Sequence, residues 1–176
     1  PDAMLEQFAQ QIQALVEGGI DGIIVETMIS PEEAILAARA AKKVLETIPV
    51  IVNLTYEPTA RGPRTMMGTS PDGFVKMLSE QGVEIQGVGT NCGTGADDMV
   101  AVVEELRAAT LLPIAAYANA GMPRMQDGVA VYDETPEEFS VKTLKLVAAG
   151  ASLVGGCCGT TPEHIRALRE KLADGK

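Results

Sequence analysis

The hydrophobic positions of the chain fall into short apolar runs, and each run is followed by a stretch with helical spacing. The five runs are GIIVET at 22–27, PVIVNLTY at 49–56, IQGVGTN at 85–91, LPIAAYAN at 112–119 and ASLVGG at 151–156. They are continuous rather than alternating, which is typical of strands that are buried on both faces of a parallel α/β sheet. The pattern therefore predicts five parallel strands.

Helix start signals follow the runs. Ser30-Pro31-Glu32-Glu33 and Thr135-Pro136-Glu137-Glu138 each place a hydroxyl at the N-cap, proline next and glutamate at the third helical position, which predicts a capping box. Two further helices begin at Ser70-Pro71 and Thr161-Pro162, and another covers 96–109. The opening segment predicts one more helix, because its apolar residues recur at near-helical spacing: Leu5, Phe8, Ile12 and Leu15.

The repeated order predicts a helix followed by five βα units. The 155 residues from Gly22 to Lys176 hold these five units, and eight units of that size would make about 250 residues, the usual length of a (β/α)₈ barrel. We predict an α/β fold of the (β/α)₈ barrel type that lacks its first three strands, with residues 1–176 as a single domain. An open, doubly wound sheet with five or six strands is the alternative.

Composition narrows the classes of partner. The net charge of -10 disfavours nucleic acid and anionic membrane surfaces, since no cluster of Lys and Arg is available to neutralise phosphates. No apolar run approaches the ~18 residues of a membrane span, and the polar N-terminal segment does not resemble a secretory signal, so we expect a cytoplasmic protein. Adjacent Cys157 and Cys158 could close only a strained disulfide, which predicts reduced thiols.

Polar residues gather where the predicted strands end. These residues are Glu26 and Thr27, then Asn53, Thr55 and Tyr56, then Asn91 and Cys92, then Tyr117 and Asn119, and last Cys157 and Cys158. The carboxyl ends of parallel strands meet at one face of an α/β fold, so the three cysteines are predicted to converge there. Three soft thiolates with no fourth ligand suit a zinc site with an open position.

Other interpretations of these residues remain. A single cysteine in a strand is commonly a small buried hydrophobe, and this applies most strongly to Cys92. Glu26 could cap a backbone amide or pair with a lysine. The only histidine, His164, falls at the third position of the last helix and is predicted to be a capping or surface residue rather than a ligand.

Four segments resemble the homocysteine S-methyltransferase family: IIVETMISPEEA at 23–34, GTNCGTGADD at 89–98, PIAAYANAG at 113–121 and GGCCGTTPEHIRAL at 155–168. VYDETPEEF at 131–139 is most similar to the cobalamin-dependent methionine synthase branch. The resemblance implies an enzyme with a (β/α)₈ barrel that methylates homocysteine to methionine. It also implies a zinc ion held by Cys92, Cys157 and Cys158, and substrate-binding roles for Glu26, Thr27, Asn91 and Asn119. The methyl donor implied is a methylcobalamin-bearing partner protein or domain.

The family's N-terminal strands have no counterpart in these 176 residues. Five βα units leave two unpaired parallel edges, so we expect this piece to pair with the missing N-terminal half of the barrel or to form a homo-oligomer. Two other functions stay open. One is a non-catalytic barrel fragment or assembly module that retains a structural zinc. The other is a thiol redox protein using Cys157 and Cys158, which the adjacent spacing and the lack of a C-x-x-C motif disfavour.

Overall fold

The computed structural model of the protein describes residues 2–174, so residues 1, 175 and 176 of the predicted domain lie outside the described part. None of the helices in residues 2–174 combines the length and the apolar character needed to cross a bilayer. The elements follow one another in this order: α1 (Asp2–Glu17), β1 (Ile23–Met28), α2 (Pro31–Val44), β2 (Val50–Leu54), α3 (Pro71–Glu80), β3 (Gly87–Gly95), α4 (Ala96–Ala109), β4 (Ile114–Asn119), β5 (Arg124–Gln126), β6 (Val129–Val131), α5 (Pro136–Ala148), β7 (Leu153–Gly156) and α6 (Pro162–Asp174).

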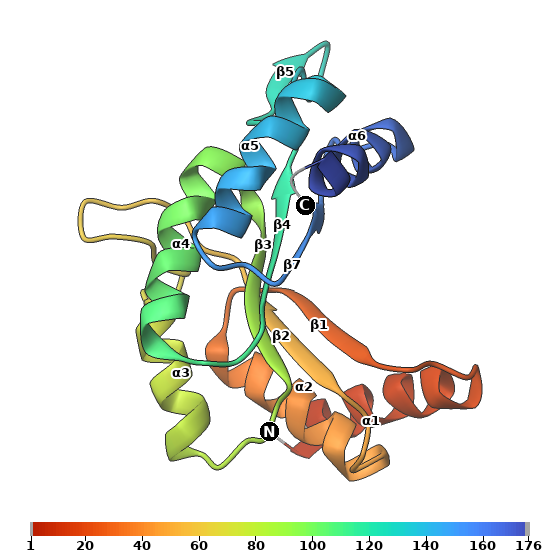
Figure 1. The fold of residues 1–176 in the computed structure, drawn as a ribbon. Helices are drawn as coiled ribbons and strands as arrows, with labels where there is room; N and C mark the ends of the chain where they lie inside the picture. Colours follow the sequence, from red (N-terminus) through yellow and green to blue (C-terminus); the bar gives the residue numbers. More distant parts are fainter. Residues whose placement is uncertain (1, 175–176) are drawn as a thin grey trace.

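One parallel sheet organises the fold. Its strand order, β1-β2-β3-β4-β7, follows the chain without reversal, and all four strand pairs are parallel. The helices lie around one face of this sheet, and α2, α4, α5 and α6 contact the strands beside them (Figure 1). A doubly wound sheet would reverse its strand order and carry helices on both faces. The predicted barrel type is therefore confirmed, as an incomplete barrel with five strands, and the doubly wound alternative is wrong.

The two faces of the sheet differ in burial. On β1, Ile23 and Val25 face the helices and are buried, whereas Ile24 faces the other way and is 45% exposed. At the opposite edge Leu153 of β7 is 40% exposed. We call this second face the concave face, because it corresponds to the interior of a closed barrel. In residues 2–174 no helix covers it (Figure 1).

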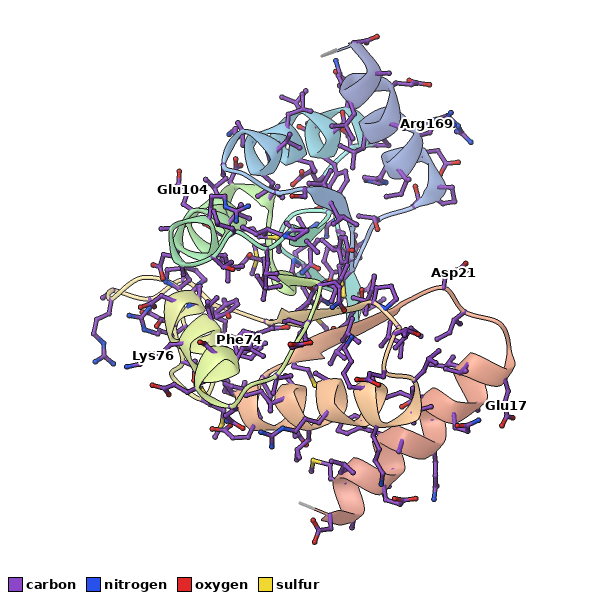
Figure 2. The ribbon with its side chains drawn as sticks, turned by 60° about the horizontal axis from the view of Figure 1, so that its bottom comes forward. Glu17, Asp21, Phe74, Lys76, Glu104 and Arg169 are labelled. Atoms are coloured by element: carbon purple, nitrogen blue, oxygen red, sulfur yellow. The ribbon has the colours of Figure 1, made fainter. Side chains whose placement is uncertain are left out.

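The core lies between the sheet and the helices. Small side chains let α2 approach the strands closely, since the alanines of its inner face are almost fully buried: Ala34, Ala37, Ala38, Ala40 and Ala41. Figure 2 shows Phe74 of α3 pointing inward, whereas Lys76 on the same helix points to solvent. Glu104 and Arg169 likewise lie on the outside (Figure 2). This is the amphipathic arrangement that the apolar spacing predicted.

The predicted helix starts are confirmed, but the caps differ in detail. Thr135 forms the full capping box with Glu138. At Ser30 the predicted box is only half formed: the Ser30 hydroxyl accepts from the Glu33 amide and donates to the Glu32 carboxylate, and the structure records no bond from the Ser30 backbone amide to the Glu33 side chain. The sequence pattern therefore predicted one half of this box correctly.

A β-hairpin between β4 and α5 is absent from the sequence prediction. Strands β5 and β6 pair antiparallel, and the Asp127-Gly128 turn between them has φ values of 51° and 79°. Asp-Gly is a favoured dipeptide for a two-residue hairpin turn with positive φ at both positions. That signal is present in the chain, but the strands it joins are only three residues long and carry no apolar alternation. This hairpin leads directly into the segment beside the thiols.

Candidate metal and substrate site

The three cysteines converge, as the sequence predicted. Their sulfur atoms all lie within 4.8 Å of one another, and the Cys92 and Cys158 sulfurs are 3.6 Å apart. Cys92 lies near the end of β3, and the other two follow β7, so the parallel sheet brings together residues 66 positions apart. All three are free thiols, and Cys158 is the most exposed of them. Inert, buried cysteines would not gather at one exposed point of the sheet.

Burial changes the pKa of one thiol, that of Cys157. Burial, followed by the charge of Cys92, raises the pKa of the Cys157 thiol to about 11, while a hydrogen bond from Asn91 works in the opposite direction. In a metal-free protein Cys157 is therefore protonated at neutral pH. A cation bound among the three sulfurs reverses this preference, because thiolates are its ligands.

Two of the predicted site residues have left-handed backbone conformations. Thr27 has a φ of 57° and Cys92 has a φ of 62°, and neither is a glycine. Both lie where the strand register shifts, between Val25 and Met28 on β1 and between Asn91 and Gly95 on β3. Such bulges bend a strand and re-aim its side chains. A positive φ at the β-branched Thr27 is unusual and costs about 1–3 kcal/mol.

Asn91 holds this arrangement together. Its Oδ1 accepts from the Thr27 amide at 2.8 Å, and its Nδ2 donates to the Thr27 hydroxyl at 2.7 Å. The same Nδ2 lies 3.9 Å from the Cys157 sulfur as a weak donor. Asn91 is only 1% exposed, and its own carbonyl accepts from the Thr55 hydroxyl at 3.0 Å. Asn91 thus links β1 and the segment after β7 through its side-chain amide, and the end of β2 through its backbone carbonyl.

Asn119 fixes the pair of adjacent cysteines from the other side. Its Oδ1 accepts from the Cys158 amide at 3.1 Å. The backbone continues the pairing of β4 with the segment after β7, since the Cys157 amide donates to the Ala118 carbonyl at 2.7 Å and the Ala120 amide to the Cys158 carbonyl at 2.9 Å. Asn119 therefore lies against the cysteine pair.

Glu26 lies on the concave face but makes no contact with the thiols that the structure records. The eight ion pairs of residues 2–174 do not include it, so neither a lysine nor an arginine neutralises its carboxylate there. The Glu26 carboxylate affects Tyr117 of β4. The pKa of the Tyr117 phenol is raised first by burial and then by the negative charge of Glu26. Tyr117 packs over Gly155, where a Cβ would lie 3.1 Å from its ring. In the sequence, Tyr117 marks only the end of a predicted strand.

Two buried polar groups near the site lack partners. Asn53 of β2 is fully buried, and neither its amide nitrogen nor its amide oxygen has a hydrogen-bond partner. It lies on Gly89 of β3, where a Cβ would be 2.5 Å from the Asn53 Oδ1. The Tyr56 hydroxyl is also unpaired, and burial raises the pKa of this phenol. Buried polar groups are normally paired, so both mark places where a partner is expected.

His164 is a cap, as predicted, but it is buried rather than at the surface, with 6% exposure. Its Nδ1 accepts from the Thr161 amide at 3.2 Å at the start of α6, and its Nε2 lies 2.9 Å from the Glu134 carbonyl. Nδ1 is therefore the acceptor, and Nε2 carries the proton and donates. The histidine joins α6 to the segment that follows the hairpin.

Sequence comparisons give two matches that cover almost the whole chain. A sequence model of the family described as homocysteine S-methyltransferase matches residues 1–172. The chain is 31% identical over 173 residues to a methionine synthase of Mycobacterium leprae (strain TN). The match covers 96% of this chain and 14% of that protein.

Solved structures agree on the fold. The apo form of the homocysteine methyltransferase MmuM from Escherichia coli superposes with a TM-score of 0.74 at 24% identity, covering 95% of this chain and 57% of that one. The carboxyl transferase domain of Rhizobium etli pyruvate carboxylase, solved with pyruvate and biocytin, superposes with a TM-score of 0.56 at 16% identity, covering 90% of this chain and 24% of that one. The chain spans just over half of the first structure and about a seventh of the methionine synthase.

Proposed function

Because the chain belongs to the homocysteine S-methyltransferase family, we propose that it forms the metal-binding part of an enzyme that methylates the sulfur of homocysteine to give methionine. The observation that carries the proposal is the cluster of three thiols from two distant segments. A family match by itself would not place these sulfur atoms together at an accessible point.

The sulfur cluster fits a zinc ion. Zinc–sulfur bonds of about 2.3 Å in a tetrahedron separate neighbouring sulfurs by about 3.8 Å. The separation of 3.6 Å between the Cys92 and Cys158 sulfurs is close to this value, and the upper limit of 4.8 Å among the three requires only small side-chain rotations. Among residues 2–174 no fourth Cys, His, Asp or Glu joins the cluster. Three protein ligands and one open position are the arrangement of a catalytic zinc.

Each remaining residue has a proposed task. Zinc, when bound, lowers the pKa of a thiol and keeps the substrate sulfur as a nucleophilic thiolate. Asn91 orients Cys157 and Thr27 through its buried amide, and Asn119 fixes the Cys158 backbone. Glu26, whose charge has no partner in the described residues, binds the ammonium group of homocysteine and so orients the substrate. Thr27 lies between Glu26 and the Asn91 amide and completes this part of the site.

The barrel is proposed to be completed by three further βα units, and residues 1–176 are proposed to act as one domain of it. Both edges of the sheet carry apolar grooves: one of about 350 Å³ between β7 and α6, lined by Val154, Leu168 and Leu172, and one of about 210 Å³ along α1 and β1. Neighbouring βα units would cover such grooves in a closed barrel. A second copy of the chain is the other candidate for these edges.

The methyl donor is proposed to be a corrinoid cofactor carried by a partner domain, which the similarity to a methionine synthase supports. Three free thiols, one of them exposed, fit a reducing compartment, which we propose to be the cytoplasm. A non-catalytic fragment that keeps a structural zinc is the second candidate function, favoured by the two uncovered edges.

Metal analysis with a proton-release assay tests the proposal. We expect the full chain to bind about one zinc, and the Cys157→Ser variant to lose most of it, because serine is a poor zinc ligand. Ser79→Ala, at the exposed end of α3, is the control for zinc that is lost while the protein is prepared.

Adding homocysteine should release about one proton per zinc, whereas homoserine, which lacks the thiol, should release none. Glu26→Gln should keep the zinc but weaken homocysteine binding about tenfold, since it loses a charged partner. Zinc binding without proton release would favour the structural fragment. Unchanged zinc in Cys157→Ser would refute the metal site.

A further inference from the structure

The thiol cluster contains all three cysteines of the chain. Their sulfur atoms lie within 4.8 Å of one another, and among residues 2–174 no His, Asp or Glu side chain joins them. A site built from sulfur alone prefers soft partners over the hard cations that oxygen ligands bind. The cluster is therefore suited to soft ligands other than the zinc ion proposed above.

Three sulfurs without a fourth donor match the valence of trivalent arsenic. This atom forms three single bonds to sulfur and keeps a lone pair in the fourth direction, so it needs no further ligand. Arsenic–sulfur bonds are close in length to zinc–sulfur bonds of about 2.3 Å. Because the lone pair narrows the angles between these bonds, the sulfurs lie slightly closer together around arsenic than around zinc. The separation of 3.6 Å between the Cys92 and Cys158 sulfurs suits this pyramid.

The backbone brings the thiols together before any ligand binds. The Cys157 amide donates to the Ala118 carbonyl at 2.7 Å and the Cys158 amide to the Asn119 Oδ1 at 3.1 Å, which fixes the adjacent cysteines against β4. Cys92 is turned toward them by its positive φ of 62°. This arrangement avoids much of the entropy that three separate thiols would lose on gathering around one atom. Cys158 is exposed and the other two cysteines are partly exposed, so a small molecule reaches the cluster.

We propose that Cys92, Cys157 and Cys158 together form a binding site for trivalent arsenic, supplied as arsenous acid, As(OH)₃. In each of three steps a thiol sulfur attacks arsenic, one arsenic–oxygen bond breaks, and the leaving hydroxide takes the thiol proton as water. As(OH)₃ and three thiols thus give As(SR)₃ and three water molecules. Arsenic stays trivalent, so the reaction needs neither an oxidant nor a reductant. Arsenous acid is uncharged at neutral pH, so the net charge of -10 does not repel it.

Bound arsenic occupies all three sulfurs and directs its lone pair toward the position proposed for the substrate sulfur. It therefore excludes both zinc and homocysteine, and arsenous acid acts as an inhibitor of the site. The inhibition rests on the function proposed above. The binding itself rests only on the three thiols, so the two are tested separately.

Mass spectrometry of the metal-free full chain counts the bonds to arsenic. The chain is kept reduced with a phosphine, which adds no competing thiol, and is mixed with arsenous acid. We expect one arsenic per chain, with a mass increase of one arsenic atom less three hydrogen atoms. The chain has no other cysteine, so this mass identifies the three ligands.

Two serine variants and the unfolded chain test the contribution of the fold. Cys92→Ser and Cys158→Ser leave two thiols, so arsenic should keep one hydroxyl in the adduct. Affinity, measured by competition with a dithiol, should fall about a hundredfold or more, because the third bond closes within one molecule. The wild-type chain unfolded in urea should bind about as weakly as Cys92→Ser, since only the adjacent cysteines stay close together. Ser79→Ala, on the exposed end of α3, is the matched control and should bind like wild type.

The outcomes separate this proposal from the proposed function. One arsenic that displaces three protons, bound more weakly by both serine variants and by the unfolded chain, supports the arsenic site. A wild-type adduct that keeps a hydroxyl on arsenic overturns it, as does equal affinity in wild type and Cys92→Ser, even where zinc binding and proton release by homocysteine stand. A three-bond adduct in a chain that binds no zinc supports the arsenic site and refutes the proposed function. An arsenic-loaded chain that still takes up zinc overturns the shared site.

Discussion

Removing the Asn91 side chain should destabilise the fold itself, not only the metal site. The Asn91→Ala substitution deletes two short hydrogen bonds to Thr27, at 2.8 and 2.7 Å, and empties a position that is 1% exposed. Each hydrogen bond contributes about 1 kcal/mol net, and the small cavity adds about 1 kcal/mol. The expected loss in the free energy of unfolding is about 2–3 kcal/mol. For a chain of this size that corresponds to about 4–12 °C in Tm.

Asn53 provides an internal control for this reasoning. It is also a buried asparagine at the carboxyl end of a strand, but its amide nitrogen and oxygen make no hydrogen bond in the described residues. Asn53→Ala removes an unsatisfied polar group, and the relief offsets the lost packing, so we expect a change of less than about 1 kcal/mol. The two variants thus separate the effect of the hydrogen bonds from the effect of truncating a buried amide.

Urea unfolding, followed by far-UV circular dichroism, measures both variants. The protein is kept reduced and metal-free with a chelator, so that weaker metal binding cannot lower the apparent stability. Asn91→Asp adds a third point: it keeps the acceptor for the Thr27 amide, but it loses both Nδ2 contacts and buries a carboxylate, so it should be destabilised at least as much as Asn91→Ala. The reasoning is refuted if Asn53→Ala costs as much as Asn91→Ala, or if Asn91→Ala unfolds like wild type.

Two further predictions concern the sheet and the thiols. Gly89→Ala should prevent β3 from pairing with β4, because its Cβ would lie 2.1 Å from the Ala115 carbonyl oxygen. Gly87→Ala is the control and should fold, since its Cβ would make contacts of 3.1 Å and longer. Soluble yield and thermal unfolding compare the two variants, and equal behaviour would contradict the close approach of β4 to Gly89. In the metal-free protein, the raised pKa of Cys157 means that the unfolded chain loses its proton near the ordinary value of 9.0 while the folded chain keeps it to about 11. Stability should therefore fall as the pH rises from about 9 to 11, and Cys157→Ala should flatten that slope in urea midpoints taken across this range.

Much of the fold could be predicted from local signals. The apolar runs ending at Thr27 and Asn119 and the hydroxyl-proline-glutamate helix starts depend only on neighbouring residues, so they can be read along the chain. The convergence of Cys92 with Cys157 and Cys158 needed one more step, since parallel strands present their carboxyl ends at one edge. The sequence therefore predicted the cluster without knowing any distance.

The features that escaped prediction depend on contacts between distant residues. Tyr132 lies against Gly159, whose missing side chain leaves room for its ring, and the Glu134 carbonyl is bound by His164, thirty residues further along. The unpaired amide of Asn53 follows from its burial against Gly89 of the next strand. No spacing rule within one segment carries such information, because it arises only when strands and loops pack together.

The bulges at Thr27 and Cys92 explain how the predicted residues reach the site at all. Side chains alternate along a regular strand, so Cys92 would share the helix-facing side with Val88 and Thr90, away from Asn91. The positive φ at Cys92 breaks this alternation, and consecutive residues Asn91 and Cys92 both reach the cysteine pair after β7. Thr27 is turned in the same way toward Asn91. The strain of about 1–3 kcal/mol at each position is offset by the hydrogen bonds of Asn91 and by the strand pairing on either side. A strand without these bulges would keep every site residue in the sequence and still fail to bring the three sulfurs together.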